Sequence, residues 1–275
     1  MKQKAKGLVK MWLARRSCVL LALCFTIPMA ARAAELTVPG TGDGLDILKA
    51  IGAVFTAENP EFPVNIPPSI GSGGGIAAVA TGRAVIARIA RPLSEAEQAQ
   101  GLHAVLVFQI PSAIFANAAS STAELTSPQL REIFQGGIVN WQEVGGANVR
   151  IRVVRRENED STLNVLRASM PGWKDLVFTP KTKTAVTTQD MIQSVREVEG
   201  AIGFGPFTPT MQQGLVALKI DGLGPTDKKY PSYVQIALIY ADASVTPEAK
   251  RFIEFIKSAK AAAIITNMGA APIGD

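Results

Sequence analysis

Histidine and cysteine are almost missing from this chain, and their scarcity limits the chemistry that it can perform. Among its 275 residues, His103 is the only histidine, and both cysteines, Cys18 and Cys24, fall within the first 34 residues. Histidine-based triads, histidine-rich metal sites and thiol chemistry are therefore nearly excluded. We expect a protein that uses no metal and no cofactor and that is not an enzyme.

Long hydrophobic runs are also missing after the first 34 residues. The leader combines a basic start, an apolar stretch over residues 17–29 that is too short to span a bilayer, and the small-residue cleavage signal Ala31-Arg32-Ala33. It predicts a cleaved signal peptide at residues 1–34 and hence a periplasmic protein. No later stretch reaches roughly 18 apolar residues without a charge, so no stable membrane insertion is expected.

The exported part of the chain lacks an excess of positive charge. The whole sequence has 28 basic and 23 acidic side chains, but seven of the basic ones and none of the acidic ones lie in the predicted signal peptide. The remainder carries 21 basic and 23 acidic side chains, a formal charge of −2. The sequence pI near 9.3 thus describes the precursor. Nothing in the exported part favours nucleic acid or a membrane surface as a partner.

No repeat and no serine- or proline-rich linker interrupts residues 35–275, which argues against two independent domains in series. Short strands and helices alternate instead, which predicts a parallel sheet covered by helices, as in an α/β protein. Asp43 is expected to cap the first of these helices, and a group that contacts the ligand is the alternative interpretation of this residue. The expected strands are 36–38, 64–66, 85–87, 105–110, 113–117, 149–154, 200–206 and 234–240, and the expected helices are 45–59, 76–81, 94–97, 127–134, 163–168, 188–195 and 247–268.

Two segments far apart in the sequence have the composition of anion-binding junctions. Residues 71–75 read Gly-Ser-Gly-Gly-Gly, and the strand over 149–154 leads into a polar loop that ends at Ser161-Thr162. Each segment places glycine or a small hydroxyl residue between a strand and a helix, where free backbone N–H groups and the helix dipole can hold an anion. They predict two half-sites that close on one oxyanion. The first segment lacks the spacing of a dinucleotide or Walker loop, and a simple tight turn is the alternative interpretation.

Together with three further segments, these junctions resemble a known family. The segments are Gly71–Gly75, Ala90–Ser94, Phe134–Trp141, Val153–Thr162 and Gly200–Phe204. In this order they resemble the phosphate-type periplasmic substrate-binding proteins, the soluble receptors of ABC importers. The resemblance implies an α/β fold of two lobes, each a mixed or parallel sheet flanked by helices, with a ligand cleft at the hinge.

The resemblance also implies how the chain is divided between the lobes. Residues 35–112 and 206–275 are expected to form lobe 1, and residues 113–205 are expected to form lobe 2. Two crossing strands, near Pro111–Asn117 and Gly205–Thr208, would make the hinge.

The residues that would face the ligand follow from the same resemblance. Ser72 matches the family's hydroxyl donor on the first glycine loop, Arg156 matches its cationic ligand residue, and Thr162 matches the hydroxyl at the end of the second loop. The full set of candidate ligand-binding residues is Thr41, Gly42, Ser72, Gly73, Gly74, Arg91, Arg156, Asn158, Ser161 and Thr162.

The sequence departs from the family at two places that bear on the ligand. Where the phosphate receptors carry an aspartate that accepts a proton from the ligand, this chain has Ala90. In the second loop, Asn158 stands for aspartate, Asp160 for serine and Ser161 for glycine. An unpaired ligand hydroxyl is costly, so the loss of an acceptor weakens the preference for phosphate over sulfate. Asp160 could replace that acceptor, or it could repel a dianion.

The remaining cations leave a further alternative open. Arg88 and Arg91 are expected to form a solvated pair, but either would add positive charge to the cleft if it turned inward. Arg155 and Arg156 cannot point the same way on a strand, and Arg156 is the expected ligand residue.

We therefore expect an exported solute-binding protein, a monomer, that captures a small oxyanion and delivers it to a membrane ABC permease. Inorganic phosphate is the simplest ligand. One alternative is a diverged receptor or accessory protein with the same fold and a different ligand. Another is an exported phosphatase, for which Ser72 or Ser161 would be a nucleophile without an evident base.

Overall fold

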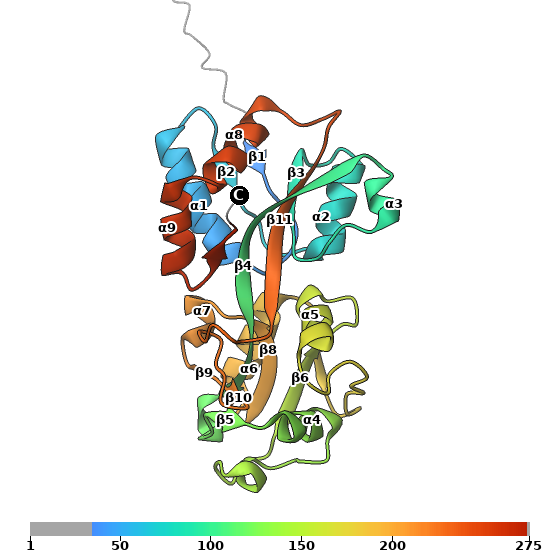
Figure 1. Ribbon diagram of the computed structural model, residues 1–275, viewed down its shortest axis with the longest axis vertical. Coiled ribbons are helices and arrows are strands. Elements are labelled where there is room, and N and C mark those ends of the chain that lie inside the picture. The colour runs from blue at the N-terminus through green and yellow to red at the C-terminus, as the bar shows by residue number, and fades with distance from the viewer. Residues whose placement is uncertain (1–34, 274–275) are drawn as a thin grey trace, which may run out of the picture. The chain divides into compact units, whose positions relative to one another are not determined.

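The computed structural model describes residues 35–273 (Figure 1). The predicted signal peptide at residues 1–34 lies outside these residues. The strands are β1 Leu36–Thr37, β2 Val64–Asn65, β3 Ile86–Ile89, β4 Leu102–Asn117, β5 Glu124–Leu125, β6 Arg152–Arg156, β7 Lys183–Ala185, β8 Ala201–Pro206, β9 Leu215–Ala217, β10 Lys219–Ile220, β11 Tyr233–Ala241 and β12 Ala271–Pro272. The helices are α1 Leu45–Glu58, α2 Gly71–Ala80, α3 Glu95–Gln98, α4 Ser127–Gln135, α5 Ser161–Ser169, α6 Thr188–Glu197, α7 Pro209–Gln212, α8 Pro247–Ile256 and α9 Ala259–Asn267. No helix within residues 35–273 is long and apolar enough to cross a membrane.

The largest sheet has the strand order β3-β11-β4-β8-β6-β7 and is mixed. Strands β6, β7 and β8 run parallel to one another, as the alternation of strands and helices predicts. The prediction of a parallel sheet is wrong for the other half, because β11 runs antiparallel to both β3 and β4. This strand comes from the C-terminal part of the chain, which the local pattern could not assign to a neighbour.

Two hydrophobic cores define two lobes, as expected. One core is built from residues between 113 and 220 and contains the aromatic group Phe134, Trp173 and Phe204. The main core of the other lobe is built from residues between 36 and 110 and between 234 and 270. Strand β4 contributes to both cores and therefore joins the lobes, with β11 beside it (Figure 1).

The lobe boundaries at 112/113 and 205/206 stay predictions, and the cores suggest a different return point. Phe207, Leu215 and Ile220 follow the expected boundary at 206 but pack in the second-lobe core. We propose that the chain returns to the first lobe later, within residues 221–232, just before β11.

Several element boundaries differ from the sequence prediction, and three of the differences have a clear physical reason. Strands expected at 105–110 and 113–117 are the single strand β4, because the ladder changes partner from β11 to β8 at Pro111, where a missing N–H is tolerated. Helix α2 begins at Gly71 and not at Ile76, so the glycines form its first turn. The expected C-terminal helix is two helices, because Ser258 caps α9 by accepting a hydrogen bond from the Ala261 N–H.

Gly40 is the position at which the first-lobe loop most clearly requires glycine. Its φ is +138°, and a Cβ built on it would lie 1.9 Å from the carbonyl oxygen of Arg88. That carbonyl accepts the Thr41 N–H at 3.1 Å, so it cannot move away without releasing the loop. Gly101 also has a positive φ, +76°, but has nothing within 4 Å of a built Cβ.

We expect Gly40→Ala to lower the free energy of unfolding by more than about 3 kcal/mol, because it adds a backbone collision to unfavourable dihedral angles. Gly101→Ala is the matched control. It should lower the free energy of unfolding only by the cost of the unfavourable dihedral angles, about 1–2 kcal/mol. Chemical denaturation of both variants measures the difference. Equal losses would show that the close approach of Gly40 to Arg88 does not constrain the loop.

Candidate functional site

A buried arginine shapes the first-lobe loop that precedes α1. Arg88, on β3, has no exposed surface. Its guanidinium donates to the carbonyls of Thr41 at 2.6 Å and Pro67 at 2.8 Å, and to that of Val38. Burial lowers the pKa of Arg88 to about 10, so the group stays charged at neutral pH. The expected solvated pair with Arg91 is therefore wrong for Arg88, which turns inward and orders the loop.

Two serine hydroxyls meet where α2 and α5 begin. Ser72 lies in the first turn of α2, in the first lobe, and Ser161 is the first residue of α5, in the second lobe. Their Oγ atoms are 3.1 Å apart, and both residues are buried. The Ser72 Oγ also accepts the backbone N–H of Ala90 at 3.1 Å. The two glycine- and hydroxyl-rich junctions of the sequence thus meet, with two helix N-termini directed at one place.

Asp43 is the carboxylate that links the lobes. It lies in the loop before α1, is almost fully buried, and accepts the hydroxyl of Thr162 at 3.0 Å and that of Thr188 at 2.8 Å. Both threonines belong to first turns of second-lobe helices, α5 and α6. Nearby, the Gln189 side chain donates to the Gly42 carbonyl at 3.2 Å. The expected capping role of Asp43 is wrong, because α1 begins after Gly44 without a side-chain cap.

Arg156 is the cation of this cluster. It ends β6, is 6% exposed, and donates to both carboxylate oxygens of Glu157, at 3.1 and 3.0 Å. The same guanidinium lies 3.1 Å from the carboxylate of Asp160 and 3.3 Å from the Thr188 hydroxyl. Through Thr188, Arg156 is therefore connected to Asp43.

The carboxylates of the cluster are poorly solvated. Burial raises the pKa of Asp43, against the effect of its bonds to Thr188 and of the Arg156 charge. Burial and, next, the charge of Asp43 raise the pKa of Asp160 to about 7, although the Arg156 charge opposes them. One guanidinium thus faces two carboxylates that bind protons more readily than exposed ones. An anion enters such a site at the lowest cost when at least one of these groups is protonated.

Most residues expected at the site lie together in the structure. Thr41 accepts the Asp43 N–H at 3.1 Å and supports the loop. Gly73 and Gly74 lie in the first turn of α2, and a Cβ on Gly73 would meet nothing within 4 Å. The expected residues that the structure brings to this cluster or its helix ends are Thr41, Gly42, Ser72, Gly73, Gly74, Arg156, Ser161 and Thr162.

Arg91 and Asn158 are not brought to the cluster. Arg91 forms an ion pair with Glu97 at 2.8 Å, while the same glutamate accepts the N–H of Ser94 at the start of α3. Asn158 is exposed at the tip of its turn and accepts hydrogen bonds from Arg155 and Arg167. Their assignment as ligand residues therefore gains no support from these contacts.

Thr188 is a functional candidate that the sequence alone did not assign, and Asp43 is one for which the sequence favoured a capping role over a ligand contact. Thr187-Thr188 looks like an ordinary helix start, and Thr187 does cap α6 by accepting the Asp190 N–H at 3.0 Å. The second threonine is left to reach across to Asp43. Within residues 35–273 no group of three or more His, Cys, Asp or Glu side chains could hold a metal ion.

Two lobes that share a mixed sheet, with small hydroxyl residues and helix N-termini from each lobe meeting between them, define a bilobal binding-protein fold. The chain belongs to the PBP superfamily: the model of the PBP superfamily domain matches residues 28–260.

Several phosphate-binding proteins are similar to this chain. The phosphate-binding protein PstS of Bacillus subtilis is 26% identical over 255 residues, which cover 88% of this chain and 81% of that protein. A crystal structure of an ABC-type phosphate transport receptor from Vibrio cholerae has a TM-score of 0.64 at 25% identity, covering 87% of this chain and all of the other. A phosphate-bound structure from Clostridium perfringens has the same fold, with a TM-score of 0.78 at 24% identity over 88% of this chain and all of the other.

The raised pKa of Asp160 predicts a specific dependence of stability on pH. In the folded protein Asp160 holds its proton up to about pH 7, whereas its ordinary pKa is 3.8. Between these values the folded state binds more protons than the unfolded state, so the free energy of unfolding falls as pH rises, by at most about 1.4 kcal/mol per pH unit. Asp160→Asn keeps a good helix-capping residue. We expect it to reduce this slope, so that its free energy of unfolding compares most favourably with that of the parent protein near pH 8.

Urea denaturation at intervals between pH 4.5 and pH 8 measures this slope. Glu159→Gln is the control, because it removes an exposed charge from the same turn and should leave the slope unchanged. A slope that is the same in Asp160→Asn as in the parent protein would contradict the assignment.

Proposed function

We propose that this protein is an exported receptor that captures a small oxyanion, foremost inorganic phosphate, between its lobes and delivers it to a membrane-embedded ABC importer. The observation that carries the proposal is the meeting of Ser72 and Ser161, with Oγ atoms 3.1 Å apart, at the first turns of helices from different lobes. Hydroxyls and free backbone N–H groups at two helix N-termini are suitable donors for a tetrahedral oxyanion.

The wider ligand set follows from the same cluster. Arg156 can donate from its guanidinium to two ligand oxygens when it releases Glu157, and Thr162 can donate its hydroxyl to the ligand when it releases Asp43. The buried carboxylates Asp43 and Asp160 favour a ligand that carries a proton, because such a ligand can donate where a fully ionised one is repelled. Phosphate has such a proton near neutral pH, and sulfate does not.

The relatives are consistent with this ligand and with a transport role. The Bacillus subtilis relative is named as a phosphate-binding protein, and the Vibrio cholerae structure as an ABC-type phosphate transport receptor. We infer the corresponding location and partner for this chain: export through the predicted signal peptide into the periplasm, action as a monomer, and docking to an ABC permease.

A diverged receptor for a different ligand is the second candidate function. Ala90 supports it, because this residue offers no acceptor at the position where the phosphate receptors have one. A hydrolytic role has less support. The only histidine, His103, pairs with Asp242 at 2.9 Å on an exposed part of the molecule, while Ser72 and Ser161 contact each other. We therefore infer binding without turnover.

Calorimetric titration with phosphate, sulfate and arsenate tests the proposal. The protein is expressed from its full sequence, purified after export, and unfolded and refolded to remove ligand. We expect phosphate to bind more tightly than sulfate. Ser72→Ala should weaken phosphate binding roughly tenfold, because it removes one hydrogen bond to the anion. Arg156→Gln should weaken it roughly a hundredfold, because it removes a charged group that can donate two hydrogen bonds.

Arg155→Gln is the matched control, since the Arg155 side chain contacts the backbone carbonyl of Arg156, exposed Asn158 and the ring of Phe178, and makes no contact with the Arg156 guanidinium. It should leave phosphate affinity within about twofold, as is usual for a solvated charge away from the ligand. No heat with phosphate from a folded protein would reject this ligand, and equal losses at both arginines would reject the assigned role of Arg156.

A further inference from the structure

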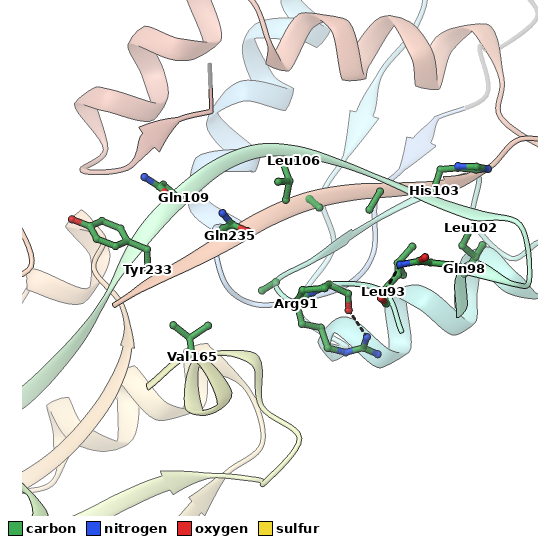
Figure 2. Close-up of a pocket in the computed structure, with 14 residues that line it drawn as sticks. Arg91, Leu93, Gln98, Leu102, His103, Leu106, Gln109, Val165, Tyr233 and Gln235 are labelled. Carbon is green, nitrogen blue, oxygen red and sulfur yellow. Dashed lines mark hydrogen bonds between the residues drawn. The ribbon is translucent and has the colours of Figure 1, made fainter. Parts of the chain in front are cut away.

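A cavity of about 670 Å³ lies beside the hydroxyl cluster and is not used by it (Figure 2). Its walls come from the hinge strands β4 and β11, from the segment that follows Ala90, and from α5. Figure 2 shows Gln109, Leu106 and Gln235 on the strand side and Val165 of α5 opposite. Sites for small organic ligands commonly occupy roughly 300–1,000 Å³, so this space is far larger than a phosphate ion needs.

The cavity lies next to the candidate oxyanion site, and two residues connect them. Ala90 lines the cavity, and its backbone N–H donates to the Ser72 Oγ at 3.1 Å. Val165 lines it from the second lobe and lies one helical turn after Ser161, a rise of about 6 Å along α5.

The ionisable side chains Arg91 and His103, which line the cavity, already have partners within the protein. Arg91 is held by Glu97 at 2.8 Å and His103 by Asp242 at 2.9 Å. Neither of these two side chains therefore presents an unpaired ionisable group to the cavity. A group that enters the cavity gains most from being uncharged.

The polar groups that do remain are two carboxamides. Gln109 and Gln235 lie directly opposite each other on the antiparallel strands β4 and β11. Among the hydrogen bonds of residues 35–273, none uses either amide side chain. Each amide offers donors and an acceptor. Beside them, Leu106 is 43% exposed and supplies an apolar surface. Amides next to an aliphatic wall suit a short hydroxylated carbon chain.

We propose that the cavity holds the organic substituent of a phosphomonoester or phosphonate whose anionic group occupies the Ser72–Ser161 cluster. The substituent is small, uncharged and hydroxylated, and its hydroxyls bond to Gln109 and Gln235. This inference rests on the proposed function, since it needs the oxyanion site, and it extends that function from phosphate to its organic derivatives. Inorganic phosphate binds the same cluster and makes no contact with the cavity.

Titration of the exported, refolded protein with glycerol 3-phosphate and with phosphate tests the inference. Leu106→Trp fills the cavity, and the double change Gln109→Ala with Gln235→Ala removes its polar groups. We expect glycerol 3-phosphate to bind to the parent protein and to lose affinity tenfold or more in both variants, while phosphate affinity changes less than twofold. Val177→Trp is the control, because Val177 is 74% exposed and does not line the cavity.

The outcomes separate this inference from the function on which it rests. Phosphate binding without glycerol 3-phosphate binding overturns the inference and leaves the phosphate receptor standing. Binding of both, with equal affinities in the parent protein and in Leu106→Trp and the glutamine variant, also overturns it. If neither ligand binds to the folded protein, both the proposed function and the inference fail. Circular dichroism of each variant establishes that a lost affinity is not a lost fold.

Discussion

The first-lobe half of the site depends on a buried guanidinium that has backbone carbonyls in place of a carboxylate partner. Arg88 gathers the carbonyls of Val38, Thr41 and Pro67 around one charge, and Gly40 allows its own loop to approach the Arg88 backbone. A buried charge is tolerated only when its donors are satisfied, so the three chain segments are fixed together. The loop that carries Asp43 is therefore held in place, and Asp43 in turn contacts Thr162 and Thr188 of the second lobe.

The contact between the lobes depends on a few side-chain hydrogen bonds. Asp43 accepts hydrogen bonds from hydroxyls of α5 and α6, and Ser72 meets Ser161, so these side-chain links between the lobes run through first turns of helices. These are the groups that an oxyanion would use. A ligand at this place competes with contacts between the lobes and substitutes for them, because its oxygens can accept from the same hydroxyls. Capture and lobe closure then share one set of donors.

The sequence predicted more of the fold than of the candidate site. Glycine and hydroxyl residues at 71–75 and 161–162, placed at strand-to-helix junctions, predicted the two segments that meet. The bond between Asp43 and Thr188 could not be predicted, because it joins residues 145 positions apart and the neighbouring sequence makes each look like an ordinary helix-start residue. Arg91 shows the converse. It lies in a family-like segment, yet Glu97, six residues later, pairs with it, and that local ion pair outweighs any more distant partner.

Charge balance explains how such a site can distinguish anions without being strongly positive. Arg156 is shared among Glu157, Asp160 and Thr188, so little unpaired positive field remains to attract a dianion. Recognition must then come from matched donors and acceptors. Under the proposed function, the carboxylate of Asp43 or Asp160 supplies the acceptor that Ala90 cannot offer. Burial raises the pKa of both groups, that of Asp160 to about 7, so Asp160 can exchange a proton with a ligand near neutral pH.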